Sequence, residues 1–456
     1  MNRTRLKRSC AVVLATGVIL AGCARSDNST TSNGSNGTAA TGGSTPAGGS
    51  TASGPFIDPS TDCKNYKGTA GINGDTIKIG TIRPASGPYA IYDQVTAGVE
   101  AYFKAKNASG GIKAGDGKSY KVELVKGDDG YDPGKTLGEA KKLVEQDGVF
   151  ALDGVIGTEG NLAIRQYLND GCIPNISLAT GSPEWGAADK YPWYISGLPS
   201  YATEAHAWAE LLKKQKPDAK VALLYQDDDF GKSYQSSFKK AIAGTNIKVI
   251  AEQSFNPLSG GTTEAAVTSL SQSGADTFIV GIGGTPCPQT LKFMPATWKP
   301  MTFISITCQS KIALSLAGGN DVGVYSAQVT YDPSDPADKG VPAVKQFVTE
   351  GQAGGLTQSQ IEGGISSAGW GFAALFAKAL EGSKTVDRAT VMNTLFSLKN
   401  ASFGLLRDGV TVNTNGSTDP WPVEGFRMVQ RTADGWKEVV PVTNYEGQSN
   451  SFAVKN

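Results

Sequence analysis

Three consecutive segments decide the fold: IKIGTI (77–82), TAGVEAYFKAKN (96–107) and YKVELV (120–125). The first and third are short and rich in residues that favour strands. The middle segment repeats apolar residues at helical spacing, with Val99 and Phe103 on one face. A strand, a helix and a second strand in this order predict two parallel strands joined by a crossover helix.

The same alternation continues through most of the chain. Further strands are predicted at residues 150–156, 173–177, 220–225, 247–253, 275–282, 301–306 and 322–329. Further helices are predicted at residues 133–147, 162–170, 202–214, 231–243, 263–273, 341–350, 361–380 and 388–398. The pattern divides into two runs near residues 197 to 201. The sequence therefore predicts an α/β protein with two doubly wound parallel-sheet lobes, and a ligand site between them, beyond the carboxyl ends of the strands.

The N-terminus has the features of a signal peptide at residues 1–22. Basic residues within 3–8 precede an apolar run at 11–21, which is too short to span a bilayer. The run ends in LAGC (20–23), which resembles the bacterial lipobox and implies that Cys23 is acylated and becomes the first mature residue. Two or more acyl chains would anchor the protein to the outer face of a bacterial cell membrane. An ordinary signal peptide with a chance cysteine is the alternative.

Residues 24–55 are nearly all Ser, Thr, Gly, Ala and Asn, with no apolar periodicity from which a core could form. We therefore expect residues 23–66 to be a lipidated cysteine followed by a flexible tether. A linker of this kind reaches roughly 30 Å, at about 5–6 Å multiplied by the square root of its length. A disordered tail without a function is the alternative.

The composition excludes nucleic acid as a partner. Lysine plus arginine and aspartate plus glutamate both number 42 among the 456 residues, and no basic stripe is present. About 400 residues remain after the signal peptide and tether, which is enough for two domains of ordinary size.

Six cysteines are present, of which Cys10 leaves with the signal peptide and Cys23 takes the lipid. The other four are Cys63, Cys172, Cys287 and Cys308. An even number in an oxidising compartment predicts two disulfide bonds; among the three possible connectivities we favour Cys63–Cys172 with Cys287–Cys308. A metal site is the competing interpretation. The lack of a CxxC pair and the single histidine argue against it, and we expect neither a metal nor a cofactor.

No arrangement typical of a catalyst is found in the sequence. GxSxG, Walker A and HExxH motifs are absent, and the single histidine, His206, lies in a helical stretch. The loop GIGG (281–284) lacks dinucleotide-binding spacing and is interpreted as a hinge or cleft-lining loop. The run of three aspartates at 227–229 either caps the following helix or turns one carboxylate toward a cationic group of a ligand.

Several segments resemble one known family, in the same order along the chain. They are IGTIRPASGP (79–88), ASGGI (108–112), VKGDD (125–129), VIG (155–157) and LYQDDDFG (224–231). Over residues 75–440 the chain resembles the leucine/isoleucine/valine-type solute-binding lipoproteins of ABC importers, which have a type I periplasmic-binding fold.

This resemblance implies a clamshell whose lobes are joined by a three-strand hinge. Lobe one would comprise residues 75–197 and 331–380, and lobe two residues 198–330 and 381–456. Ligand binding would close the lobes by a hinge motion. The closed form would then dock on ABC permease subunits that are powered by a cytoplasmic ATPase, and a monomer is the expected state.

The resemblance also implies the ligand-binding residues of lobe one. Thr158 lies where the family binds a ligand carboxylate, and beside it Glu159 would repel that group unless it points away. Ala179, Thr180 and Ser182 form a loop whose backbone N–H groups suit an anion or a polar head group.

The resemblance also implies an aromatic wall at Tyr92, a second aromatic wall at Phe230 and a lobe-two loop at Thr285. Both aromatic residues could instead be core residues. The family's acidic partner for an α-ammonium group would fall near Gln309, where no acid is present. An amino-acid ligand would then need Glu159 or the aspartate run that ends at Asp229, because an unpaired buried ammonium is strongly disfavoured.

We therefore predict a receptor that binds a small polar molecule, an amino acid or a related compound, and does not catalyse a reaction. Amides, short peptides, urea-like solutes and aromatic acids are alternative ligands. A receptor of the same fold that signals to a membrane partner is an alternative function, followed by a surface lipoprotein with a vestigial cleft. An enzyme is the most distant possibility.

Overall fold

A computed structural model describes residues 55–454, which lie in one compact unit. The predicted signal peptide, Cys23 and most of the predicted tether fall outside the described residues. Within residues 55–454, no helix has the length and apolar character needed to cross a membrane.

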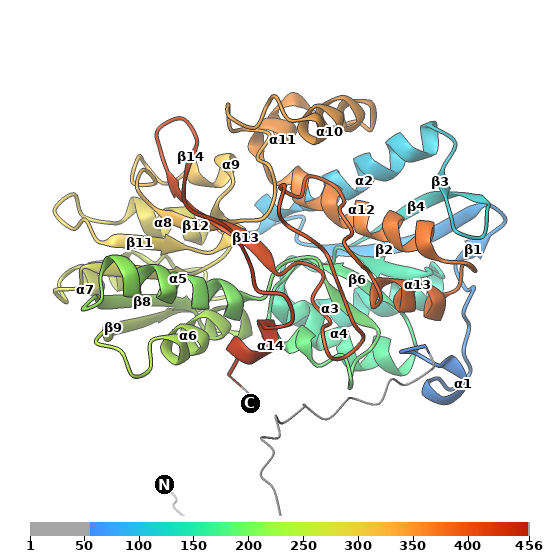
Figure 1. The fold of residues 1–456 in the computed structure, drawn as a ribbon, viewed down its shortest axis with the longest axis horizontal. Coiled ribbons are helices and arrows are strands. Elements are labelled where there is room, and N and C mark those ends of the chain that lie inside the picture. The colour runs from blue at the N-terminus through green and yellow to red at the C-terminus, as the bar shows by residue number, and fades with distance from the viewer. Residues whose placement is uncertain (1–54, 455–456) are drawn as a thin grey trace, which may run out of the picture. The chain divides into compact units, whose positions relative to one another are not determined.

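The first sheet has the strand order β3-β4-β2-β5-β6-β7, with β1 paired to β2 outside this path (Figure 1). Its strands are β1 (Ile72–Asn73), β2 (Thr76–Arg83), β3 (Ile112–Lys113), β4 (Ser119–Asp128), β5 (Ala151–Asp153), β6 (Asn175–Leu178) and β7 (Tyr194–Ser196). Its helices are α2 (Asp93–Ala108), α3 (Pro133–Lys141) and α4 (Thr158–Asp170). All pairs are parallel except β1 with β2 and β3 with β4. This sheet and its helices form lobe one.

The second sheet has the order β14-β13-β12-β11-β10-β8-β9 and forms lobe two. Its strands are β8 (Lys220–Gln226), β9 (Lys248–Phe255), β10 (Thr277–Gly281), β11 (Met301–Ile304), β12 (Tyr325–Gln328), β13 (Gly425–Arg431) and β14 (Trp436–Asn444). Its helices are α5 (Tyr201–Gln215), α6 (Asp229–Ala241), α7 (Glu264–Ser271), α8 (Pro286–Lys292) and α9 (Lys311–Leu314). Only β13 and β14 run antiparallel to their neighbours. The predicted fold class of two parallel-dominated α/β lobes is confirmed.

Burial on both faces explains the parallel strands. Ile77, Ile79 and Ile82 of β2 are all 0% exposed, as expected for a strand covered by helices on both sides. Helix α2 packs on α12 (Ser366–Gly382), and two glycines permit this close approach. A Cβ atom at Gly98 would lie 1.9 Å from the Ser366 carbonyl oxygen, so no larger residue fits there without movement of a helix.

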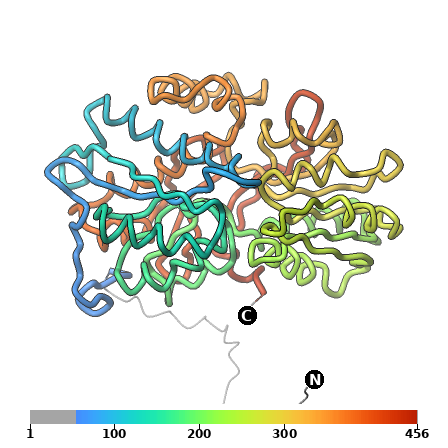
Figure 2. The backbone as a smooth tube through the Cα atoms, turned by 180° about the vertical axis from the view of Figure 1, so that it is seen from behind, coloured from blue at the N-terminus to red at the C-terminus, as the bar shows by residue number. Residues whose placement is uncertain are grey.

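The chain passes between the lobes three times, as the expected three-strand hinge requires. The crossings follow β7, β12 and α13 (Arg388–Leu395), and the C-terminal segments in orange and red return to both halves (Figure 2). Two hinge segments are bonded to each other: Thr330 and Leu406 form an antiparallel bridge, and the Tyr331 N–H donates to the Leu405 carbonyl at 2.8 Å.

The predicted assignment of residues 381–456 to lobe two needs a correction for α13. Arg388 of this helix donates to the Phe150 carbonyl from Nε at 2.7 Å and to the Val149 carbonyl from Nη2 at 2.9 Å, and both acceptors belong to lobe one. A buried guanidinium group requires such acceptors, and they lie at the start of β5. Lobe one therefore extends through α13, and lobe two receives β13 and β14.

Two disulfide bonds are present, with the pairing favoured from the sequence. Cys63 is bonded to Cys172, and the two Cα atoms are 6.1 Å apart. Cys287 is bonded to Cys308 with a Cα separation of 6.2 Å. The first bond holds the N-terminal segment of the described chain against lobe one. The second joins α8 to the short helix at Ile306–Cys308 in lobe two.

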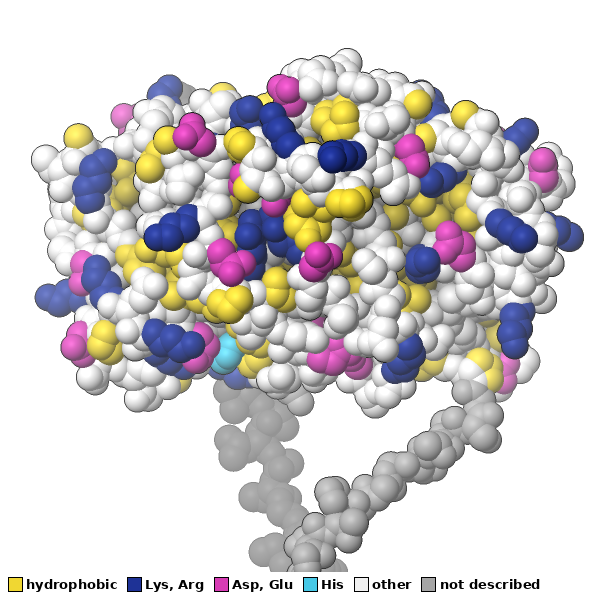
Figure 3. All heavy atoms as spheres, turned by 45° about the horizontal axis from the view of Figure 1, so that its top comes forward, with side chains coloured by type: hydrophobic (Ala, Val, Ile, Leu, Met, Phe, Trp, Pro, Cys, Tyr) yellow, Lys and Arg dark blue, Asp and Glu magenta, His cyan; other side chains and the backbone are white. Residues whose placement is uncertain are grey.

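Lysine and arginine side chains are interspersed with aspartate and glutamate on the face shown in Figure 3, without an extended area of one sign.

Candidate functional site

A cavity of about 160 Å³ lies between the lobes, beyond the carboxyl ends of the strands. Lobe one contributes Tyr131 and Ile156, lobe two contributes Phe230 and Ile306, and the hinge contributes Leu405. Most of the lining is therefore aromatic or aliphatic. A dry apolar cavity of about 150 Å³ accommodates benzene, so this volume suits a small ligand with an apolar body.

Five of the predicted site residues line this cavity: Tyr92, Thr158, Ala179, Phe230 and Gln309. The loop at 281–284 also reaches it through Gly283, in agreement with its interpretation as a cleft-lining loop. The other five predicted residues are not among the lining residues: Glu159, Thr180, Ser182, Asp229 and Thr285.

Tyr92 has a larger role than the aromatic wall predicted from the sequence. Its hydroxyl accepts a hydrogen bond from the Gly284 N–H at 2.6 Å and donates to the Thr307 carbonyl at 3.2 Å. Burial raises the pKa of Tyr92, so the hydroxyl keeps its proton and remains a donor. Because Tyr92 belongs to lobe one and both partners belong to lobe two, one hydroxyl joins the lobes.

Thr180 and Ser182 support the site from behind. The hydroxyl oxygens of Thr158 and Thr180 are 2.6 Å apart and both side chains are buried. The Ser182 N–H donates to Thr180 Oγ1 at 3.4 Å, and the Ser182 hydroxyl caps the short helix that follows. These bonds hold Thr158 at the start of α4, where its side chain meets the cavity.

Glu159, Asp229 and Thr285 connect the lobes instead of facing the cavity. The Asp229 N–H donates to Glu159 Oε1 at 2.6 Å, and the Thr285 N–H donates to the Pro88 carbonyl at 3.0 Å. Glu159 therefore points away from the cavity, which removes the predicted repulsion of a ligand carboxylate. The predicted role of Glu159 or Asp229 as partner of a ligand ammonium finds no support in this arrangement.

The other two aspartates of the run are also engaged. Asp227 forms an ion pair with Lys232 at 2.9 Å, and Asp228 caps α6 by accepting from the Gly231 N–H at 3.1 Å. The capping interpretation of this run is therefore the correct one for Asp228.

The lobes are in contact in this structure. Besides the bonds already described, the Tyr89 hydroxyl of lobe one donates to Gln226 Oε1 of lobe two at 2.7 Å. The Tyr89 ring stacks on Tyr131 with a centroid distance of 3.9 Å. The stack lies within lobe one and orients Tyr89, whereas the hydrogen bonds join lobe one to lobe two, so the conformation is a closed one.

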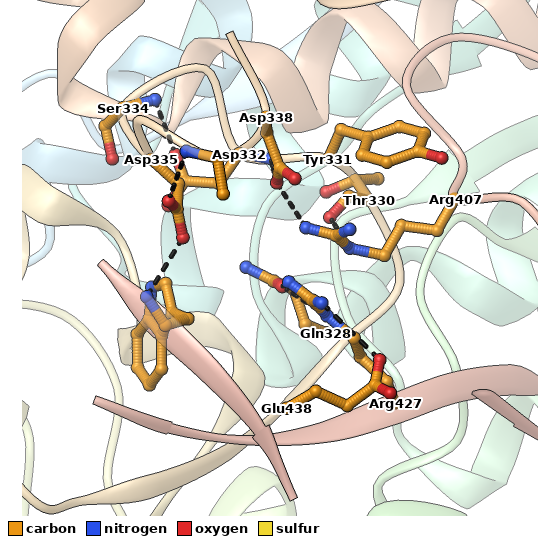
Figure 4. A network of polar contacts seen from close by, with 12 residues as sticks. Gln328, Thr330, Tyr331, Asp332, Ser334, Asp335, Asp338, Arg407, Arg427 and Glu438 are labelled. Atoms are coloured by element: carbon orange, nitrogen blue, oxygen red, sulfur yellow. Dashed lines mark hydrogen bonds and ion pairs between the residues drawn. The ribbon is translucent and has the colours of Figure 1, made fainter. Parts of the chain in front are cut away.

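Sequence reasoning missed the polar groups beside the hinge, which Figure 4 shows as one network. Gln328 is 2% exposed and lines the cavity. Its Oε1 accepts from Arg427 Nε at 2.9 Å and Nη2 at 2.6 Å, and Arg427 also forms an ion pair with Glu438 at 3.5 Å. The Arg427 guanidinium therefore fixes the orientation of the Gln328 amide.

Asp332 also lies in this network and lines the cavity. The Ser334 N–H donates to its Oδ1 at 2.8 Å. Burial raises the pKa of Asp332. A sequence signal for this residue was available, because three aspartates follow the strand predicted at 322–329 at a spacing of three residues.

Comparisons with known proteins place the chain among binding proteins. A family model described as periplasmic binding protein matches residues 76–430. A curated relative, the Leu/Ile/Val-binding protein homolog 3 of Brucella melitensis, is 29% identical over 212 residues, which cover 46% of this chain and 54% of the relative. The chain thus matches about half the length of the curated relatives.

Two solved structures illustrate the likeness in fold. A branched chain amino acid ABC transporter protein of Thermus thermophilus with bound valine has a TM-score of 0.71 and 19% identity, covering 82% of this chain and 97% of that one. A solute binding protein of an ABC transporter from Rhodopseudomonas palustris, in complex with p-hydroxybenzoic acid, has a TM-score of 0.66 and 22% identity, covering 82% and 98%. At these identities the likeness concerns the fold alone.

Proposed function

Because the chain belongs to the periplasmic binding protein family, whose members bind solutes and are not enzymes, we propose that it is the receptor of an ABC importer. It captures a small molecule between its lobes and delivers it to membrane permease subunits that a cytoplasmic ATPase powers. The observation that carries this proposal is the cavity lined by both lobes and by the hinge. A ligand in that position contacts both halves at once and stabilises the closed form.

The lining supports a ligand with an apolar body, such as an amino acid with an apolar side chain or an aromatic acid. Phe230, Ile156 and Phe372 offer aromatic and aliphatic surface, whereas Thr158 and Gln309 offer polar atoms. Such a division is typical of small-molecule sites, where apolar contacts supply most of the affinity and a few polar groups fix the orientation.

The receptor acts at the outer face of the cell membrane, where the acylated Cys23 anchors it. The LAGC sequence at 20–23 and the tether that follows support this part of the proposal. Replacement of Cys23 by alanine should release the protein from the membrane fraction. Retention of the C23A variant in membranes would contradict the lipid anchor.

A thermal-shift screen of the purified full chain tests the binding function. The compounds are amino acids, amides, short peptides and aromatic acids. A ligand at a hundredfold excess over its Kd stabilises the folded state by about 2.7 kcal/mol and so raises the melting temperature. A matched variant, Phe230→Asp, places a charge in the cavity and should abolish the shift. If no compound raises the melting temperature of the wild-type chain, the receptor proposal is wrong.

A further inference from the structure

The cavity contains a charge that the resemblance did not predict. Among the described residues that line it, Asp332 is the one with a formally charged side chain. It follows the second hinge crossing and comes from neither of the loops to which the family's ligand groups were assigned. Its surroundings therefore bear on the chemistry of the ligand.

Asp332 has no cationic partner within residues 55–454. The nearby Arg407 donates to the Asp338 carboxylate from Nη2 and to the Thr330 carbonyl from Nε at 3.0 Å, so its guanidinium group is already engaged. The backbone N–H of Ser334 is the hydrogen-bond donor to Asp332. The half-buried Asp332 carboxylate, held by Ser334 alone, retains lone pairs for a further donor.

The network around Asp332 has an excess of negative charge. Among the residues labelled in Figure 4, the carboxylates of Asp332, Asp335, Asp338 and Glu438 outnumber the guanidinium groups of Arg407 and Arg427. Asp335 is held by the backbone N–H groups of Ala337 at 2.9 Å and Trp436 at 2.9 Å, without a counter-charge. The negative potential of these carboxylates favours a cationic group in the adjacent cavity, because the apolar walls screen electrostatic interactions weakly.

A second acceptor lies on the same side of the cavity. Gln309 Oε1 is buried, and no donor within the described chain reaches it. A Cβ atom built on Gly364 would lie 3.7 Å from Asp332 Oδ1 and 3.8 Å from the Cβ atom of Ser310. Because Ser310 directly follows Gln309, the loop containing Gln309 lies beside Asp332. An ammonium group carries three donors and can serve a carboxylate and a carbonyl together.

We propose that Asp332, assisted by the Gln309 side-chain carbonyl, is the specificity residue that selects ligands with a cationic amine. This inference rests on the receptor function proposed above. Asp332 supplies from the hinge the acidic group that is missing at Gln309. The apolar body of the ligand then lies against Phe230 and Ile156.

Isothermal titration of the purified full chain with three related compounds tests the selection. L-Leucine carries an amine and a carboxylate, 3-methylbutylamine has the amine alone, and 4-methylpentanoate has the carboxylate alone. We expect the two amines to bind and 4-methylpentanoate to bind at least about thirtyfold more weakly, because loss of a buried charge partner has an effect of that size or more. Binding of 4-methylpentanoate as tight as that of leucine overturns the inference.

Variants provide an independent measurement. Asp332→Asn keeps an acceptor for the Ser334 N–H but removes the charge, and should weaken leucine binding at least about thirtyfold while leaving 4-methylpentanoate unaffected. Asp227→Asn is the control, because Asp227 is paired with Lys232 away from the cavity and should leave binding unchanged. Unaltered leucine affinity in Asp332→Asn overturns the inference.

The outcomes separate this inference from the receptor function. If 4-methylpentanoate binds and both amines do not, Asp332 does not select amines although the receptor proposal stands. If neither the amines nor the acids bind, this inference is overturned, and the receptor function is decided by the amides and short peptides of the thermal-shift screen.

Discussion

The Tyr92 hydroxyl leads to a quantitative prediction for lobe closure. Phenylalanine at this position keeps the ring but removes two hydrogen bonds to lobe two, from the Gly284 N–H and to the Thr307 carbonyl. Each contributes about 1 kcal/mol net, so about 2 kcal/mol is lost. In an open form water solvates these groups, and the loss therefore falls on the closing equilibrium. The ratio of closed to open molecules should drop by roughly thirtyfold.

Two measurements follow this change. Small-angle scattering of ligand-free Tyr92→Phe should give a larger radius of gyration than the wild-type chain, because more molecules are open. The Kd for L-leucine should rise by up to roughly thirtyfold, since affinity falls with the fraction of binding-competent molecules.

Tyr66 offers a matched control inside lobe one. Its hydroxyl also accepts from a backbone N–H, that of Ala389 at 2.6 Å, and donates to Asp387 at 2.9 Å. Tyr66→Phe should lower the melting temperature without changing the radius of gyration or the affinity. Equal loss of affinity in both variants, or none in Tyr92→Phe, would refute the reasoning about closure.

Three further changes test the packing, the cross-link and the charges. Gly98→Ala places a methyl group 1.9 Å from the Ser366 carbonyl oxygen. Urea titration should show a free energy of unfolding lower by about 1–3 kcal/mol. A change near zero would show that α2 and α12 separate easily. Replacing Cys63 and Cys172 together by serine opens a loop of sequence separation 109 and should cost about 2–5 kcal/mol by the same assay, whereas an unaltered midpoint contradicts a stabilising role. Burial and two neighbouring carboxyl groups raise the pKa of Asp419 to about 8. Its contribution to the free energy of unfolding is therefore fully present below the unfolded-state pKa of about 4 and is lost as the pH rises toward 8. Asp419→Asn should therefore reduce the fall in melting temperature between pH 5 and pH 8, and identical pH profiles of variant and wild type would contradict this origin.

The sequence was informative wherever local pattern and burial agree. The strand predicted at 220–225 is β8, Lys220–Gln226, and the helix predicted at 202–214 is α5, Tyr201–Gln215. Most positions of β8 and α5 are buried, so the apolar composition of each segment agrees with its place in the core. The helix predicted at 361–380 is instead two helices, because Gly364 between them takes a φ of +87° that a helix does not contain.

The site was predictable in part. Tyr92 comes shortly after the segment at 79–88, and Phe230 lies within the segment at 224–231, on which the resemblance rests; both line the cavity. Asp332 and Gln328 reach it only because the chain returns through the hinge, so their proximity to Gln309 is a property of the tertiary fold. The aspartate run at 227–229 allowed two interpretations from the sequence, because capping and ion pairing use such carboxylates as readily as a ligand does; Asp228 takes the capping role.

The Cys287–Cys308 bond affects how freely the two hydrogen-bond partners of Tyr92 can move. Cys308 directly follows Thr307, and Cys287 lies in α8, three residues after Gly284. The cross-link therefore joins two short helices next to the groups that bond the Tyr92 hydroxyl. The disulfide bond therefore limits how far that donor and that acceptor can move apart. The loop between the two cysteines is already closed in the folded protein, so the entropy of closing it is not lost again when the lobes come together.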